Sequence, residues 1–169
     1  MITMGIARPQ AQLTIKHMDA HGNVLRRKRR GFLGRLGLTK LDIQIVHGKV
    51  TDAFVALLTD TLVDNSDGIK NFKYHDSGTG VDAEATGDTT LGTACGEARD
   101  TGNQGEGAAN IYKSVATHTY AGTFAITEHG LFNAAADGTL MDRTKFDQVS
   151  VVEDEKVEFT YQLTNTSGG

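Results

Sequence analysis

The chain of 169 residues has a single cysteine, a single proline and no tryptophan. One cysteine excludes an intramolecular disulfide and a metal site built from several cysteines, so stability must come from packing or from contacts between subunits. Residues 1–10 lack the apolar core of a signal peptide, and no apolar run approaches the roughly 20 residues that a transmembrane helix needs. We therefore expect a protein made in the cytoplasm, with no membrane partner.

Strong overall charge is also lacking, because the net charge is only -4 at neutral pH. Such a mild value gives no global argument for binding to nucleic acid or to a membrane. The distribution of charge is uneven, however, since most basic residues lie early in the chain and acidic residues lie late. A local basic segment is therefore more informative than the total.

Glycine is abundant, at 20 residues, and threonine is frequent, which is typical of short strands joined by turns. Alternating apolar residues predict strands in IKNFKYH (69–75), NIYKSVATHT (110–119), TFAITEHGLF (123–132) and VEFTYQLTN (157–165). Several strands at this spacing indicate a mainly β protein, namely an antiparallel β-sandwich of the jelly-roll or immunoglobulin-like type.

One helix and one long loop interrupt the strand pattern. Apolar residues at three- and four-residue spacing in TDAFVALLTDTLVDN predict a helix near residues 51–64, which Thr51 would cap. Residues 76–108 are rich in Gly, Thr, Ala and Asp and poor in large apolar residues, so we expect a long surface loop. We divide the chain into an N-terminal hairpin with an extended basic arm (residues 1–40) and a sandwich domain (residues 41–169).

The basic run is the most distinctive local feature, and the residues that we expect to bind a partner are Arg26, Arg27, Lys28, Arg29, Arg30 and Arg35. Clustered Lys and Arg bind phosphates by releasing counterions, or they dock onto an acidic protein surface. Aromatic residues for base stacking are limited to Phe32. The pattern favours a protein partner over nucleic acid, and a solvated arm without a partner is the third alternative.

The stretch ITEHGLFNAAADGTLMDRTKF (126–146) gathers acidic, basic and imidazole groups, which suggests an active site. However, Glu128 and His129 are adjacent, so on a strand they would point to opposite faces and could not act on one substrate. The sequence has no HExxH motif, no serine in a nucleophile elbow and no cation beside its cysteine. We therefore expect a scaffold without enzyme activity, metal or cofactor, in which polar side chains face water and Arg143 pairs with Glu128 or Asp142 at the rim.

Three segments resemble structural proteins of tailed-bacteriophage virions: KYHDSGTGVDAEATGDTTL (73–91), YAGTFAITEHGLFNAAADGTLMDRTKF (120–146) and VEDEKVEFTYQLT (152–164). The resemblance implies a virion component and no catalytic residues. Within that class we expect a capsid decoration (cement) protein that binds the major capsid protein and neighbouring copies of itself as a homo-oligomer. The alternatives are a neck or tail component of the virion, or a nucleic-acid-binding protein that uses the basic arm.

Overall fold

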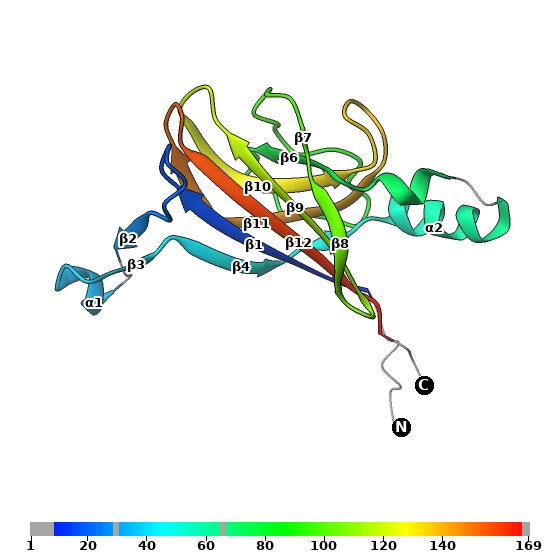
Figure 1. Cartoon of the computed structure of the whole chain (residues 1–169), viewed down its shortest axis with the longest axis horizontal. Coiled ribbons are helices and arrows are strands. Elements are labelled where there is room, and N and C mark those ends of the chain that lie inside the picture. The colour runs from blue at the N-terminus through cyan, green and yellow to red at the C-terminus, as the bar shows by residue number, and fades with distance from the viewer. Residues whose placement is uncertain (1–8, 29–30, 65–66, 167–169) are drawn as a thin grey trace.

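The computed structural model describes residues 9–28, 31–64 and 67–166, and it is a β-sandwich of two five-stranded antiparallel sheets (Figure 1). The first sheet has the order β4 (Ile43–His47), β1 (Gln10–Met18), β12 (Lys156–Thr164), β9 (Ile111–Thr119) and β8 (Asn103–Ala108). The second has the order β5 (Lys49–Val50), β11 (Leu140–Val151), β10 (Phe124–Phe132), β6 (Tyr74–Gly78) and β7 (Asp100–Thr101). The predicted fold class, mainly β and antiparallel, is confirmed.

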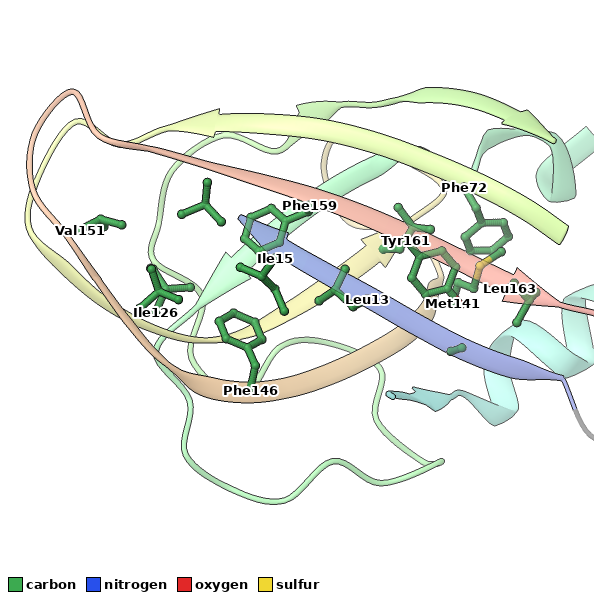
Figure 2. Packing of buried hydrophobic residues seen from close by; sticks show 14 of the residues in the cluster. Leu13, Ile15, Phe72, Ile126, Met141, Phe146, Val151, Phe159, Tyr161 and Leu163 are labelled. Carbon is green, nitrogen blue, oxygen red and sulfur yellow. The ribbon is translucent and has the colours of Figure 1, made fainter. Parts of the chain in front are cut away.

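The core lies between the two sheets, and strict alternation along the strands builds it (Figure 2). In β12 every second residue is buried, because successive side chains of a strand point to opposite faces. These buried residues are Val157, Phe159, Tyr161 and Leu163. Leu13 and Ile15 of β1 face the same layer and are fully buried. The alternation that predicts the strands therefore also identifies the residues that join the sheets.

Helix α2 (Asp52–Asp64) lies where the apolar spacing predicts it. The backbone N–H of Phe54 donates to Thr51 Oγ1 at 3.2 Å, so Thr51 caps the helix as expected. The ring of Phe54 packs edge-on against Phe72, with the ring centroids 5.2 Å apart. This contact fixes the first turn, Leu57 in the next turn also packs against the core, and α2 projects from one end of the sandwich (Figure 1). Among the described residues, no helix is long and apolar enough to span a membrane.

Residues 79–99 cover the face of the second sheet that is turned away from the first sheet. They run without a strand apart from one bridge between Gly78 and Ala94. Leu91 packs there against Phe132 and Leu140, which form a second small apolar cluster. The 3-10 helix η1 (Asp67–Asn71) occupies the first residues of the strand predicted over 69–75, and β6 begins only at Tyr74. Both β7 and β8 fall within the segment predicted as loop. All six residues of β8 are exposed and none is large and apolar, so no alternation marks it as a strand.

The basic arm is not a single extended segment as predicted but a hairpin, and it leaves the sandwich at the end opposite α2 (Figure 1). Its strands β2 (Arg26–Lys28) and β3 (Thr39–Leu41) pair with each other, and the short helix α1 (Phe32–Arg35) lies at its tip. Gly31 and Gly37, with φ of 74° and 75°, turn the chain on either side of α1. Strand β1, within the predicted segment 1–40, is an inner strand of the first sheet, between β4 and β12.

Two phenylalanine variants test the assignment of the core. Phe159→Ala removes a ring that is 1% exposed, and we expect it to lower the free energy of unfolding by about 3–5 kcal/mol. Phe32→Ala is the matched control, because that ring is 73% exposed, and the change should stay within about 0.5 kcal/mol. Urea denaturation of both variants measures the difference, and equal losses would show that the core is wrongly assigned.

Candidate functional site

Glu128 is fully buried on the hairpin of β10 and β11 that suggested an active site. A β-bulge between Ile126 and Glu128 shifts the alternation of β10, so that Ile126 faces the core while Glu128 faces the loop of residues 79–99. Its carboxylate accepts backbone N–H bonds from Gly80 at 2.9 Å, Gly92 at 3.0 Å and Thr93 at 2.8 Å. The prediction that the polar residues of this hairpin face water is therefore wrong for Glu128, because the loop of residues 79–99 covers it.

Arg143 of β11 is the cationic partner of Glu128. Its Nε lies 2.7 Å from Glu128 Oε2, and its Nη1 lies 3.0 Å from Asp88 Oδ2 in the loop. Burial alone would raise the pKa of Glu128, but the N–H of Thr93 and the guanidinium of Arg143 outweigh burial and lower it. The predicted pairing with Glu128 is confirmed, although the pair lies beneath the loop and not at an open rim. A carboxylate held in its charged form by these donors positions a loop and is poorly suited to proton transfer.

Asp142, the other predicted partner of Arg143, points to the opposite side of β11. It is fully buried, and the Thr144 hydroxyl donates to its Oδ1 at 2.5 Å. Burial raises the pKa of Asp142 to about 7, against the effect of that hydrogen bond. The core therefore holds this side chain in its neutral form over most of the acidic range.

His129 also faces the core, where it contacts a second histidine. His75 Nδ1 lies 2.9 Å from His129 Nε2, and His75 Nε2 lies 2.8 Å from Ser114 Oγ. A serine, a base and a group that orients the base can form a nucleophilic site. Here all three residues are at most 2% exposed, so in this structure no substrate can reach the Ser114 hydroxyl. The separation of 54 residues between the two histidines explains why sequence spacing did not reveal their contact.

Two further histidines lie between pairs of carboxylates. His17 contacts Asp42 at 3.1 Å and Glu155 at 3.2 Å. Burial alone would lower the pKa of His17, but its hydrogen bonds with these two carboxylates raise it. His118 lies in the same way between Asp100 and Glu97. Each of these histidines lies on a strand, and its contacts join it to a loop or, for Asp100, to strand β7 of the other sheet. The described part of the chain holds no group of His, Cys, Asp and Glu suited to a metal ion.

The basic residues predicted to bind a partner lie in different surroundings. Arg27 is half-buried, and its Nε lies 3.1 Å from Asp42 Oδ1 at the base of the arm. Arg26 is exposed and donates from Nε to Thr39 Oγ1 across the hairpin at 2.9 Å. Lys28 and Arg35 are exposed on β2 and at the end of α1. Arg29 and Arg30 lie outside the described residues.

The arm also carries apolar side chains that the sequence analysis did not single out, apart from Phe32. These exposed side chains are Phe32, Leu36, Leu38 and Leu41. In the sequence they stand in GFLGRLGLTKL, where glycines obscure both helical and strand periodicity. The arm is therefore both basic and apolar, which is the composition of a protein-binding surface more than of a solvated tail.

Comparison of the chain with protein-family models, with curated proteins and with solved structures finds no match.

Replacing the buried carboxylate tests its role in holding the loop. Glu128→Gln keeps the shape of the side chain but leaves Arg143 without its buried counter-charge, so we expect a loss of about 3 kcal/mol in unfolding free energy. Residues 79–99 should also become more sensitive to a broad-specificity protease. Glu106→Gln, on the exposed strand β8, is the control and should change neither quantity. Unchanged stability and protection in Glu128→Gln would contradict the assigned role.

The buried histidine pair predicts a loss of stability in acid. Burial lowers the pKa of His75 to about 3 and also lowers that of His129, so below pH 6.5 the unfolded chain binds protons that the folded chain does not. Each histidine then removes up to about 1.4 kcal/mol of stability per pH unit as the pH falls.

His75→Gln removes one of these two contributions. Between about pH 6 and about pH 4.5, its unfolding free energy should fall less steeply than that of the wild type, by about 1.4 kcal/mol per unit. Ser114→Ala is the control, because it removes a hydrogen bond and keeps both histidines, so its slope should match the wild type. Urea denaturation across this range measures the slopes, and identical slopes for His75→Gln and the wild type would refute the prediction.

Proposed function

We propose that this chain is a structural protein of a tailed-phage virion, and that it acts as a capsid decoration protein on the major capsid shell. The observation that carries the proposal is the arm, which projects from a compact sandwich and presents both cations and exposed apolar side chains (Figure 1). An apolar surface of this kind on a projecting segment is typical of surfaces that become covered in an assembly. The resemblance of residues 73–164 to virion proteins supports the same class.

The construction of the body supports a scaffold role. Glu128 and Arg143 hold the loop of residues 79–99 to the second sheet. Glu155, in the turn between β11 and β12, contacts His17 of β1 and so holds that turn. Loops fixed by buried polar contacts give the sandwich a constant shape, which a repeated subunit needs in order to contact its neighbours in the same way at every position.

The charge of the arm supports an acidic protein surface as its partner. All charged residues from 26 to 40 are Lys or Arg, and the exposed cations Lys28 and Arg35 flank the apolar tip. Complementary charge steers such an arm to its target, and many copies on one symmetric shell multiply weak contacts into strong binding.

A neck or tail component is the second candidate. The arm and helix α2 leave the sandwich at opposite ends, and that arrangement also suits subunits placed side by side in a ring (Figure 1). Copy number separates the two candidates, because decoration needs hundreds of copies per virion and a ring needs about a dozen or fewer.

Co-sedimentation with purified, DNA-free phage shells tests the decoration proposal. The test variant replaces Arg26, Lys28, Arg29, Arg30 and Arg35 by Ser, and it keeps Arg27 because that residue contacts Asp42 at the base of the arm. We expect saturable binding of the intact chain at hundreds of copies per shell, and binding at least about tenfold weaker for the variant.

The control variant replaces two cations of the body, Lys49 and Lys113, and should bind as the intact chain does. Absence of binding by the intact chain would refute decoration and leave the neck or tail candidate. Binding of the arm to duplex or single-stranded DNA, with affinity that falls steeply as salt rises, would instead support a nucleic-acid partner.

A further inference from the structure

The tip of the arm carries large apolar side chains that are exposed in the isolated subunit. Phe32 is 73% exposed and Leu36 is 60% exposed, and both belong to the turn around α1. Leu38 directly precedes β3 and Leu41 ends it, and both side chains are also exposed. Several exposed apolar side chains on one projecting segment, accompanied by charge, are typical of an interaction site. The arm therefore offers an aromatic anchor, Phe32, with aliphatic side chains next to it.

Helix α2 exposes a second apolar surface. Val55, Leu58 and Leu62 follow one another at three- and four-residue spacing, so they lie on one face of the helix, and Leu62 is 81% exposed. Leu58 also lines a pocket of about 200 Å³ between the helix and the end of the sandwich. The other residues that line this pocket are Phe54, Ile69, Tyr112, Met141, Leu163 and Asn165. An apolar cavity of about 150 Å³ can hold a benzene molecule, so this pocket has room for a phenyl ring.

The charges next to the two surfaces are complementary. Every charged residue from 26 to 40 is a Lys or an Arg, whereas every charged residue of α2 is an aspartate. Lys28 and Arg35 on the arm and Asp52 and Asp60 on the helix are exposed. Contact between two arms or between two helices would bring like charges together, which costs free energy, while contact between an arm and a helix pairs opposite charges.

The two surfaces of one molecule cannot meet each other. The arm and α2 lie at opposite ends of the longest dimension of the subunit, with the sandwich between them (Figure 1). The arm of one copy can, however, reach the helix of the next. Because the two surfaces differ, such a contact is head to tail, and it leaves a free arm and a free helix on every pair. It therefore continues until it closes into a ring or extends as a filament.

We propose that the arm of one copy docks on helix α2 of a second copy, with Phe32 in the pocket beside Leu58. The cations of the arm then lie along the acidic helix, and Leu36 and Leu38 cover the stripe of Val55 and Leu62. This contact joins copies of the chain to one another, and it goes beyond the binding to a capsid shell, which it does not require.

Two complementary variants test the direction of the contact. The arm variant, Phe32→Asp with Leu36→Asp, has an inactive arm and an intact helix. The helix variant, Leu58→Lys with Leu62→Lys, has an intact arm and an inactive helix. All four side chains are exposed, so both variants should unfold at the same temperature as the wild type within a few degrees. Sedimentation velocity and light scattering of the purified full chains measure their masses.

We expect the wild type to form species larger than a dimer as its concentration rises, and each variant alone to stay monomeric. A mixture of the two variants should form a one-to-one dimer and nothing larger, because only one working arm and one working helix remain. Phe32→Ala alone should weaken association of the wild type by about 10- to 100-fold, as expected for one lost anchor ring. Val81→Asp is the control, since Val81 is 75% exposed on the loop, and it should associate as the wild type does.

Several outcomes would overturn the proposal. Self-association of the helix variant alone would indicate contact between arms, and self-association of the arm variant alone would indicate contact between helices. A wild type that stays monomeric up to about 1 mM would show that the two surfaces do not bind each other. Binding to shells is measured separately by co-sedimentation, so the failure of this proposal and the failure of the decoration proposal are distinguishable.

Discussion

The covered face of the second sheet depends on one buried carboxylate, that of Glu128. An ionised side chain without water costs several kcal/mol unless hydrogen bonds replace its hydration. Three backbone N–H groups of the loop and the guanidinium of Arg143 supply these bonds. The same bonds fix the path of residues 79–99, which have few large apolar side chains of their own apart from Leu91. Solvation of one charge therefore determines the conformation of a long segment.

The sequence predicted well most elements whose residues follow a simple period, although residues 69–71 of one alternating segment form a 3-10 helix. Strand β12 buries every second residue, and α2 begins at a capping threonine with apolar residues at helical spacing, so both could be located before the structure was known. Strand β8 (Asn103–Ala108) could not, because its residues NQGEGA include no large apolar side chain and all six are exposed. Apolar periodicity in a sequence reflects the burial of one face, and an exposed edge strand has no buried face to produce it.

The polar residues of the hairpin illustrate a second limit. The adjacency of Glu128 and His129 correctly predicted that they face opposite sides, yet both sides proved to be buried. Whether a strand face meets water depends on segments far away in the sequence, here residues 79–99, and on a bulge that shifts the alternation by one residue. The arm shows the same limit, because its cations were evident in the sequence, while the contact of Arg27 with Asp42 and the exposed ring of Phe32 emerged only from the hairpin.

The edge strands of the two sheets limit how this protein can contact other molecules. An unpaired strand at the edge of a sheet can template the strand of another chain, which leads to uncontrolled stacking. In the second sheet both edges, β5 and β7, are only two residues long, and in the first sheet the edge strand β8 is polar and rich in glycine. Three of the four edges are therefore poor templates for strand addition. Molecules built in this way can be crowded together without fusing their sheets, and recognition is left to the surfaces that project from the sandwich.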